Sequence, residues 1–442
     1  MSLGAELPVW SILPFVGMLL SIALLPLFAS HFWESNGNKG LVSAIFAVPI
    51  AIYLVAGFGH EGMHQLLEKA QEYSSFILLL LSLFVITGGI VVRGSLSGTP
   101  LLNTAILALG GLLASVIGTT GASVLLIRPL LRANAPRQRK VHIVVFFIFI
   151  VSNCGGLLTP LGDPPLFLGF LKGVPFEWTL SLWKEWLLVN GLLILIFNLW
   201  DQQVFNAEEA ARPGSQLEEV MKHEPLAIDG KLNFLFLAGV VATIFASGRG
   251  LGNSGESWPF GISELLMASL AFVAFRATPA RLREANRFSW GPIVEVAVLF
   301  AGIFITMAPA LLLLNAHAAA LGVREPWQFY WASGILSSFL DNAPTYLTFA
   351  AAASGLHGIP VEGRYLGELL ALGKEGAELV AAIACGSVMM GANSYIGNGP
   401  NFMVKAIAEE AGVRMPSFFG YMAYSVGILI PIFILVTVVF FR

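Results

Sequence analysis

Two stretches rich in glycine, proline and asparagine interrupt apolar runs that are otherwise long enough to cross a membrane. They are residues 152–165 (SNCGGLLTPLGDPP) and residues 391–401 (GANSYIGNGPN), one in each half of the chain. Lipid offers no hydrogen bonds to broken backbone, so such backbone survives at membrane depth only when it is buried in protein or lines a cavity. A matched pair of interrupted segments is also the best sequence indicator of a transporter's binding site. We therefore predict a protein that moves a solute across a membrane.

Composition supports a polytopic, all-α membrane protein. Of the 442 residues 56% are hydrophobic and only 12% are charged, whereas a soluble domain carries about 25% charged residues. The net charge is −3 and no basic stripe occurs, so nucleic acid is not an expected partner. Cys154 and Cys385 both lie in apolar runs, and no structural disulfide is expected. The first apolar run lacks a basic region before it and is interpreted as a retained helix rather than a signal peptide.

Apolar runs of spanning length predict about ten crossings of a bilayer whose hydrocarbon core is about 30 Å thick. Two further runs, 101–132 and 328–355, are split near their centres by Gly118-Thr119-Thr120-Gly121 and by Asp341-Asn342-Ala343-Pro344. Each split run predicts a re-entrant helical hairpin. The crossings are expected at 9–28, 41–58, 75–92, 141–171, 180–200, 231–247, 260–276, 290–314, 377–410 and 417–441.

The order of these segments predicts two inverted repeats. Residues 1–200 form the first repeat, with its hairpin at 101–132 and its broken helix at 141–171. Residues 201–230 are interpreted as a cytoplasmic linker, and 231–442 as the second repeat, with a hairpin at 328–355 and a broken helix at 377–410. Each half crosses an odd number of times, so the second must be inverted relative to the first. Most of the 24 Lys and Arg residues fall on one side, which the positive-inside rule assigns to the cytoplasm. The expected location is the cell inner membrane, as a multi-pass protein.

Three acidic residues are expected at or near membrane depth: Asp163, Asp341 and Glu295. A carboxylate there is costly and indicates function by default. A simpler alternative exists for each. Asp163 precedes Pro164 and Asp341 precedes Pro344 by three residues, as helix caps often do, whereas Glu295 could lie at the membrane interface.

Neutral oxygen donors surround these carboxylates in the sequence, and hydroxyl and amide oxygens are hard ligands that suit a small cation. Any one of them alone is more often a packing or turn residue, so the prediction depends on their clustering at the four breaks. Burial favours the neutral form of a carboxyl group, so the same site could exchange a proton for a metal ion. No Lys or Arg occurs near the breaks; Arg128 is the nearest. The candidate binding residues are Thr119, Thr120, Ser152, Asn153, Asn342, Thr345, Asn393, Ser394, Asn398 and Asn401, with Asp163, Asp341 and Glu295.

At these motifs the chain resembles the ion-transporter superfamily, and most closely the NhaD-type sodium/proton antiporters, which are related to arsenite permeases, citrate transporters and divalent-anion/sodium symporters. The stretches 152–165, 338–345 (SFLDNAPT) and 391–401 carry the resemblance, and 118–129 and 295–307 are similar to an antiporter subgroup. The resemblance implies homodimerisation and an elevator-like movement. It also implies Na⁺ ligation by Asp163, Asn153, Asp341 and Asn393. Antiporters of this type carry an Asp-Asn pair at the first hairpin tip, where this chain has Gly118-Thr119.

Sodium/proton antiport is therefore the leading hypothesis, with Na⁺ as transported ion and no resident cofactor. An ion-coupled carrier of di- or tricarboxylates, or of arsenite-like anions, is the alternative. An enzyme is not expected. The Tyr-Asp and Gly-x-Gly-Asp signatures of intramembrane aspartyl proteases are absent, as is the His-Glu-x-x-His zinc motif.

Overall fold

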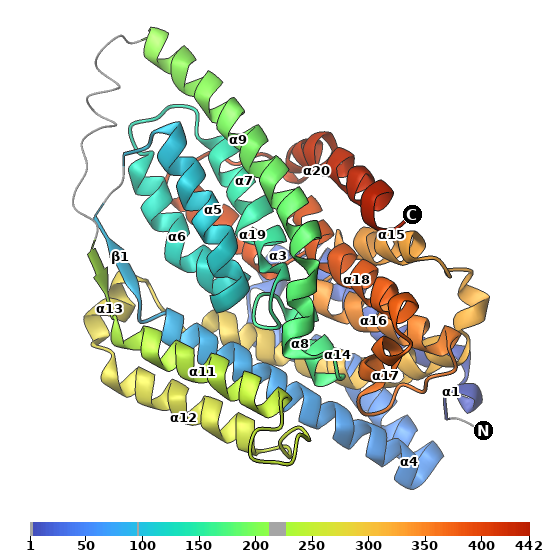
Figure 1. The fold of residues 1–442 in the computed structure, drawn as a ribbon. Helices are drawn as coiled ribbons and strands as arrows, with labels where there is room; N and C mark the ends of the chain where they lie inside the picture. Colours follow the sequence, from blue (N-terminus) through green and yellow to red (C-terminus); the bar gives the residue numbers. More distant parts are fainter. Residues whose placement is uncertain (1–2, 95–96, 212–226) are drawn as a thin grey trace.

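The computed structural model describes residues 3–94, 97–211 and 227–442, and in this part the chain is almost entirely helical (Figure 1). Seven helices in it are long and apolar enough to cross a membrane, and shorter apolar helices occur at 141–157 and 232–248. The predicted class, an all-α polytopic membrane protein, is confirmed. Two short strands, β1 (Val91–Arg93) and β2 (Ala227–Asp229), pair in antiparallel fashion.

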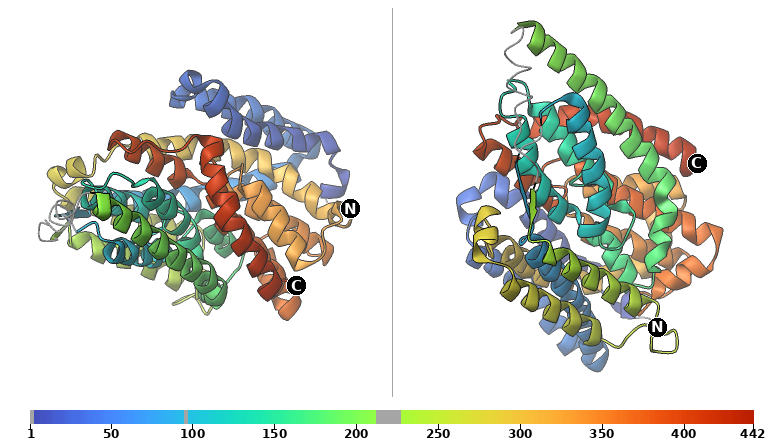
Figure 2. Two further views of the ribbon diagram at one scale, coloured as in Figure 1. Left: turned by 90° about the horizontal axis from the view of Figure 1, so that it is seen from above. Right: turned by 60° about the vertical axis from the view of Figure 1, so that its left-hand side comes forward.

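Long helices packed on α4 and α14 form one part of the molecule, which we call the frame. In Figure 1 α4, α11 and α12 run along its lower edge, and in the view from above the N-terminal helices lie along one side (Figure 2). The frame consists of α2 (Leu13–Phe28), α4 (Asn36–Thr87), α11 (Leu232–Gly248), α12 (Ile262–Ala277) and α14 (Gly291–Ala316). The short helices α1 (Leu3–Glu6), α3 (Ser30–Trp33) and α13 (Ala280–Ala285) lie between its members in the sequence.

Helix α4 contains both predicted segments, 41–58 and 75–92, and joins them without a loop. Its 52 residues form two helical segments that meet at a kink at Gly59, where φ is 53° and ψ is −120°. Glycine adopts a positive φ without steric cost, so one residue can redirect the chain without a loop. In the charged stretch that follows Gly59, Glu68, Lys69 and Glu72 form ion pairs within the protein, so the helix can carry them there.

The second part, which we call the hairpin bundle, contains both split runs and both broken helices. Helix α5 (Pro100–Ile117) turns into α6 (Thr119–Ala133) at Gly118, whose φ of 82° makes the tight reversal possible. Helix α15 (Pro326–Ser337) is followed by α16 (Asn342–Leu356), and residues 338–341 form the turn between them without a glycine. The broken helices are α7 (Val141–Ile150) with α8 (Pro164–Leu171), and α18 (Lys374–Met389) with α19 (Gly399–Glu410). Helices α9 (Trp183–Ala211), α17 (Tyr365–Ala371) and α20 (Phe418–Phe440) complete the bundle.

The predicted linker, residues 201–230, is not uniformly irregular. Helix α9 continues to Ala211 and β2 occupies 227–229, while 212–226 lie outside the described residues. The helix continues because Asp201 is fully buried and accepts hydrogen bonds from Asn103 and His142, at 2.9 and 2.8 Å. Arg137 lies 2.7 Å from the same carboxylate and 3.3 Å from Glu208, about two turns further along α9. This buried ion cluster fixes α9 against the base of the first hairpin.

Candidate functional site

Asp163 lies at the N-terminus of α8, but its carboxylate does not cap that helix. The next two residues are Pro164 and Pro165, which have no N–H to donate. The side chain is therefore free to turn away from the helix, and only 2% of Asp163 is exposed. Asp341, by contrast, does cap α16: its Oδ1 accepts from the Ala343 N–H at 3.0 Å. Asp341 therefore acts as a helix cap, whereas the Asp163 side chain does not and stays available for binding.

Three side chains from three other elements converge on the Asp163 carboxylate. The Thr119 hydroxyl, at the tip of the first hairpin, donates to Oδ1 at 2.8 Å. The amide of Asn342, at the tip of the second hairpin, donates to Oδ2, and the amide of Asn398, which precedes α19, lies 3.2 Å from Oδ1. Both hairpin tips and both broken helices therefore meet at this one carboxylate, which is the centre of the site.

A chain of asparagine side chains extends from this centre into the two breaks. Asn398 also approaches Asn153 Oδ1 at 3.2 Å, and Asn153 donates to Asn401 Oδ1 at 2.7 Å. Asn401 in turn donates to the carbonyl oxygens of Gly391 and Ser394, at 2.8 and 2.9 Å. The amides satisfy carbonyl groups that the interrupted helix leaves unpaired, and so they hold the break open in one conformation.

The same local arrangement occurs once in each half. In the first half the Thr159 hydroxyl donates to the Ser115 carbonyl and accepts from the Leu161 N–H at 3.1 Å. In the second half Ser394 makes the equivalent bonds, to the Ser338 carbonyl and from the Ile396 N–H at 3.2 Å. This match makes Asp163 the counterpart of Asn398, and Thr119 the counterpart of Asn342, so the centre combines two pairs of equivalent residues.

Two serines of this arrangement, Ser115 and Ser338, are missing from the predicted set. Ser115 donates to the Gly155 carbonyl at 2.5 Å, and Ser338 accepts from the Asn393 amide at 2.9 Å and donates to the Gly334 carbonyl at 2.8 Å. The two residues occupy the same position when the halves are aligned, four residues before Thr119 and Asn342. That alignment is the signal that could have found them.

The remaining predicted residues lie around this centre at different distances from the carboxylate. Ser152 shares a hydrogen bond of 2.8 Å with Ser123, and Thr345 bonds back to the Asp341 carbonyl at 2.9 Å. Thr120 is exposed and lines the cavity described below. Glu295 is not brought to the site: it pairs with Lys39 of α4 at 2.7 Å, inside the frame.

The centre offers oxygen atoms and no positive charge. Among the described residues, no Lys or Arg contacts Asp163, and no group of three His, Cys, Asp or Glu side chains is placed to hold a metal ion. Two buried amide oxygens, Asn342 Oδ1 and Asn393 Oδ1, have no hydrogen-bond partner in the structure. Buried acceptors without a donor are rare in proteins. They suit a ligand that is attracted to oxygen, such as a small cation.

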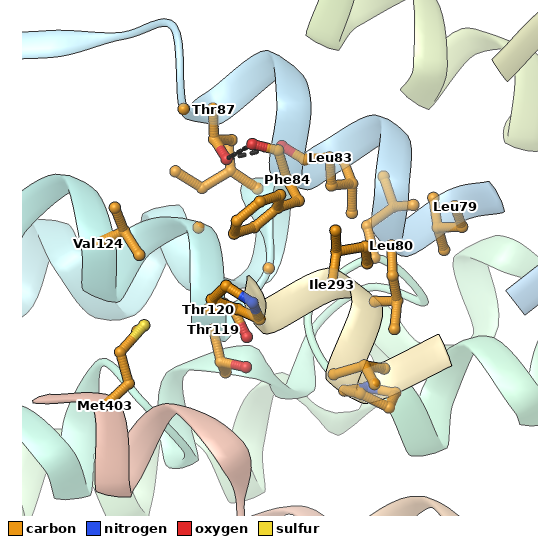
Figure 3. A pocket seen from close by; sticks show the side chains of 18 of the residues that line it. Leu79, Leu80, Leu83, Phe84, Thr87, Thr119, Thr120, Val124, Ile293 and Met403 are labelled. Carbon is orange, nitrogen blue, oxygen red and sulfur yellow. Dashed lines mark hydrogen bonds between the residues drawn. The ribbon is translucent and has the colours of Figure 1, made fainter. Parts of the chain in front are cut away.

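A cavity of about 280 Å³, which we call the site cavity, leads from the protein surface to this centre (Figure 3). Thr119, Thr120 and Asp163 are among the residues that line it. Its walls are mainly apolar, with Leu79, Leu80, Leu83 and Phe84 from α4, Ile293 from α14 and Met403 from α19. Arg128 and Arg287 also line it. The structure therefore shows Asp163 reached from one side, between the frame and the hairpin bundle.

Close backbone packing in the break gives a testable prediction for Gly162→Ala. An added Cβ at Gly162 would lie 2.0 Å from the Gly156 carbonyl oxygen, and backbone cannot give way as a side chain can. We expect a loss of stability of about 1–3 kcal/mol, with Asp163 displaced and transport reduced. Thermal unfolding in detergent measures the first effect. Gly191→Ala in α9 is the matched control: its Cβ meets nothing within 4 Å, so stability should not fall.

Three features together define a secondary transporter of a multi-pass membrane type. They are the apolar spans, the buried polar centre where broken helices and hairpins meet, and the cavity that reaches this centre from one side. The chain belongs to a family described as "putative citrate transport", whose model matches residues 4–441. A comparison with the curated proteins gives no match. The family agrees with the resemblance to the ion-transporter superfamily, in which citrate transporters are one branch. It does not distinguish cation/proton antiport from carboxylate transport.

Proposed function

We propose that this transporter exchanges Na⁺ for H⁺ at Asp163. The observation that supports the proposal most directly is the environment of this carboxylate: it is buried, it is bonded by neutral side chains from all the broken elements, and no cationic side chain among the described residues contacts it. Such a group needs a positive charge to be stable in its ionised form. A proton or a Na⁺ ion can each supply that charge, but not both at once, which is the requirement for antiport.

In this proposal the neutral oxygens are the other ligands of the cation. Asn342 directs its Nδ2 at Asp163, while its Oδ1 has no partner in the structure. The Asn153 and Asn393 side chains lie in the two breaks beside it, and Asp341 stands next to Asn342 at the hairpin tip. Elevator-type movement of the hairpin bundle along the frame, and a homodimer formed through the frame in the cell inner membrane, belong to the same proposal.

A carboxylate carrier is the second candidate function, and two observations favour it. The family description names citrate. In addition, Arg128 and Arg287 line the site cavity, and a guanidinium group is the side chain best shaped to bind a carboxylate. Arg287 is paired with Glu410, whereas Arg128 has neighbouring arginines rather than a carboxylate beside it. An anion entering the cavity would meet this positive charge before it reached Asp163.

Proteoliposomes distinguish the two candidates. With an imposed pH gradient, acidic inside, addition of external NaCl should cause proton efflux, which a trapped pH dye reports. Labelled citrate or succinate should not accumulate under any combination of Na⁺ and pH gradients. Citrate or succinate uptake without a sodium-dependent proton flux would reject antiport and support the carboxylate carrier.

A further inference from the structure

Helix α8 separates two cavities. Asp163, immediately before the helix, lines the site cavity, and Lys172, immediately after it, lines a second cavity of about 300 Å³. Phe167, in the middle of α8, lines both. The eight residues of this helix span about 12 Å at 1.5 Å per residue. Asp163 is therefore accessible from the site cavity, while α8 with Phe167 stands between it and the second cavity.

The two cavities lie near opposite ends of α12, and consecutive parts of α4 line them. The second cavity is lined by Ser263 and Glu264, at the start of α12. The site cavity is lined by Asn286 and Pro292, which follow the end of α12 and the short α13. The two cavities are therefore separate spaces on either side of Phe167, which is the residue that lines both.

A buried ion cluster closes the second cavity against α8. Lys172 Nζ lies 2.9 Å from Glu68 Oε1 and also pairs with Glu72, and Lys69 Nζ lies 2.9 and 3.0 Å from the two Glu72 oxygens. Lys69 and Lys172 are each only 2% exposed. The Lys172 ammonium group lies between the Glu68 and Glu72 carboxylates, and opposite charges at this distance favour its charged form.

The charges of the cluster balance only while α8 rests on α4. Helix α4 supplies Glu68, Lys69 and Glu72, with a net charge of −1, and the hairpin bundle supplies Lys172, with a charge of +1. Removing one partner of a buried pair leaves an uncompensated charge and is strongly unfavourable. Separating α8 from α4 is therefore favourable only if water enters and hydrates these groups, and that is what opening the second cavity would do.

Backbone contacts at the same point join α17 to the cluster. The Lys172 carbonyl accepts from the N–H groups of Leu366 and Gly367, at 3.0 and 3.3 Å, and the Gly363 N–H lies 3.2 Å from Glu68 Oε1. Helices α8 and α17, one from each half of the chain, thus meet α4 at one point. Movement of the hairpin bundle at this end must break the Lys172 ion pairs first.

We propose that the Lys172–Glu68–Glu72 cluster is a latch that sets which cavity is open to Asp163. While the latch is closed, the site cavity is open and the second cavity ends at Phe167, as in this structure. When the latch opens, the second cavity reaches the site and the first is closed. The latch acts on the conformational equilibrium of the protein, so the proposal does not depend on whether the transported ion is a cation or a carboxylate.

Thiol labelling of the full-length protein in detergent tests the latch without any transport substrate. Cys154 and Cys385 are fully buried, so they contribute little background. A cysteine at Met403→Cys reports whether the site cavity is accessible to the reagent. A cysteine at Met267→Cys does the same for the second cavity, where Met267 is 1% exposed. In the Lys172→Met background we expect the rate of maleimide labelling to fall at Met403→Cys and to rise at Met267→Cys. Each labelling rate should change by about tenfold, which corresponds to a shift in the ratio of the two conformations from about 10:1 to about 1:10.

Opposite changes at the two reporters distinguish a latch from local loosening. Increased labelling at Met267→Cys with no decrease at Met403→Cys, or no change at either, would overturn the proposal. Lys172→Arg keeps the charge and should label like the unmodified background. Should Lys172→Met fail to fold, Glu68→Gln decides: it removes one carboxylate, leaves the Lys172–Glu72 pair, and should move both labelling rates in the same directions by a smaller factor.

Discussion

Asp163→Asn is expected to reduce sodium-dependent proton flux in proteoliposomes to the level of empty liposomes, a loss of at least about 100-fold for a group that must bind and release a proton. Asparagine has nearly the same shape and can still bond to Thr119 and Asn398, so the fold should persist. It cannot take up a proton or balance the charge of a cation. Protection of the protein by NaCl against thermal unfolding should disappear together with the flux.

The matched control for this variant is Glu378→Gln, which removes one negative charge at a surface pair with Lys374, away from the site. Its flux should equal that of the unmodified protein. Asp341→Asn should have a partial effect, because Asp341 caps α16 rather than joining the network around Asp163. Sodium-dependent flux that survives in Asp163→Asn would place the exchange site elsewhere.

Arg137→Met is expected to lower the free energy of unfolding by about 3–5 kcal/mol, the effect of removing one partner from a buried ion pair. Arg137 is 1% exposed and lies 2.7 Å from Asp201, which is fully buried. Without the guanidinium, Asp201 keeps only its hydrogen bonds from Asn103 and His142. Glu208 also loses a partner at 3.3 Å.

Thermal unfolding monitored by size-exclusion chromatography in detergent measures this loss. Arg137→Lys keeps the charge but cannot reach Asp201 and Glu208 together, so its stability should lie between those of Met and Arg. A Met variant as stable as the original would mean that these charges are already solvated, contrary to their burial. Any transport defect in Arg137→Met should parallel the loss of folded protein.

The breaks were predictable because local chemistry makes them. Glycine, proline and asparagine in residues 152–165 and 391–401 cannot continue a helix, and the structure interrupts both helices there. Both hairpins turn at the predicted tips, at Gly118 and between Ser337 and Asn342. A few neighbouring residues determine where these breaks and turns occur, and tertiary contacts then hold the breaks in one conformation.

Features that depend on tertiary partners could not be predicted from the sequence. The predicted crossings end at residue 58 and resume at residue 75, yet the stretch after Gly59 is helical as well. In it Glu68 and Glu72 pair with Lys172, about 100 residues further along the chain. Asp163 and Asp341 have similar local signatures, and only the fold shows that one turns to the centre and the other caps α16. The inverted relation of the repeats and the sidedness of the membrane stay predictions.

Asp163 in the first half of the chain occupies the position that Asn398 occupies in the second half. This difference has a consequence for the energetics of transport. Only one of these twin positions carries an ionisable group, so the centre itself can hold one proton or one monovalent ion in each turn of the cycle. If all exchange occurs there, each inward cation is matched by one outward proton and no net current flows. The membrane voltage would then do no work on the cycle, and the concentration gradients of the two ions across the membrane alone would set its direction.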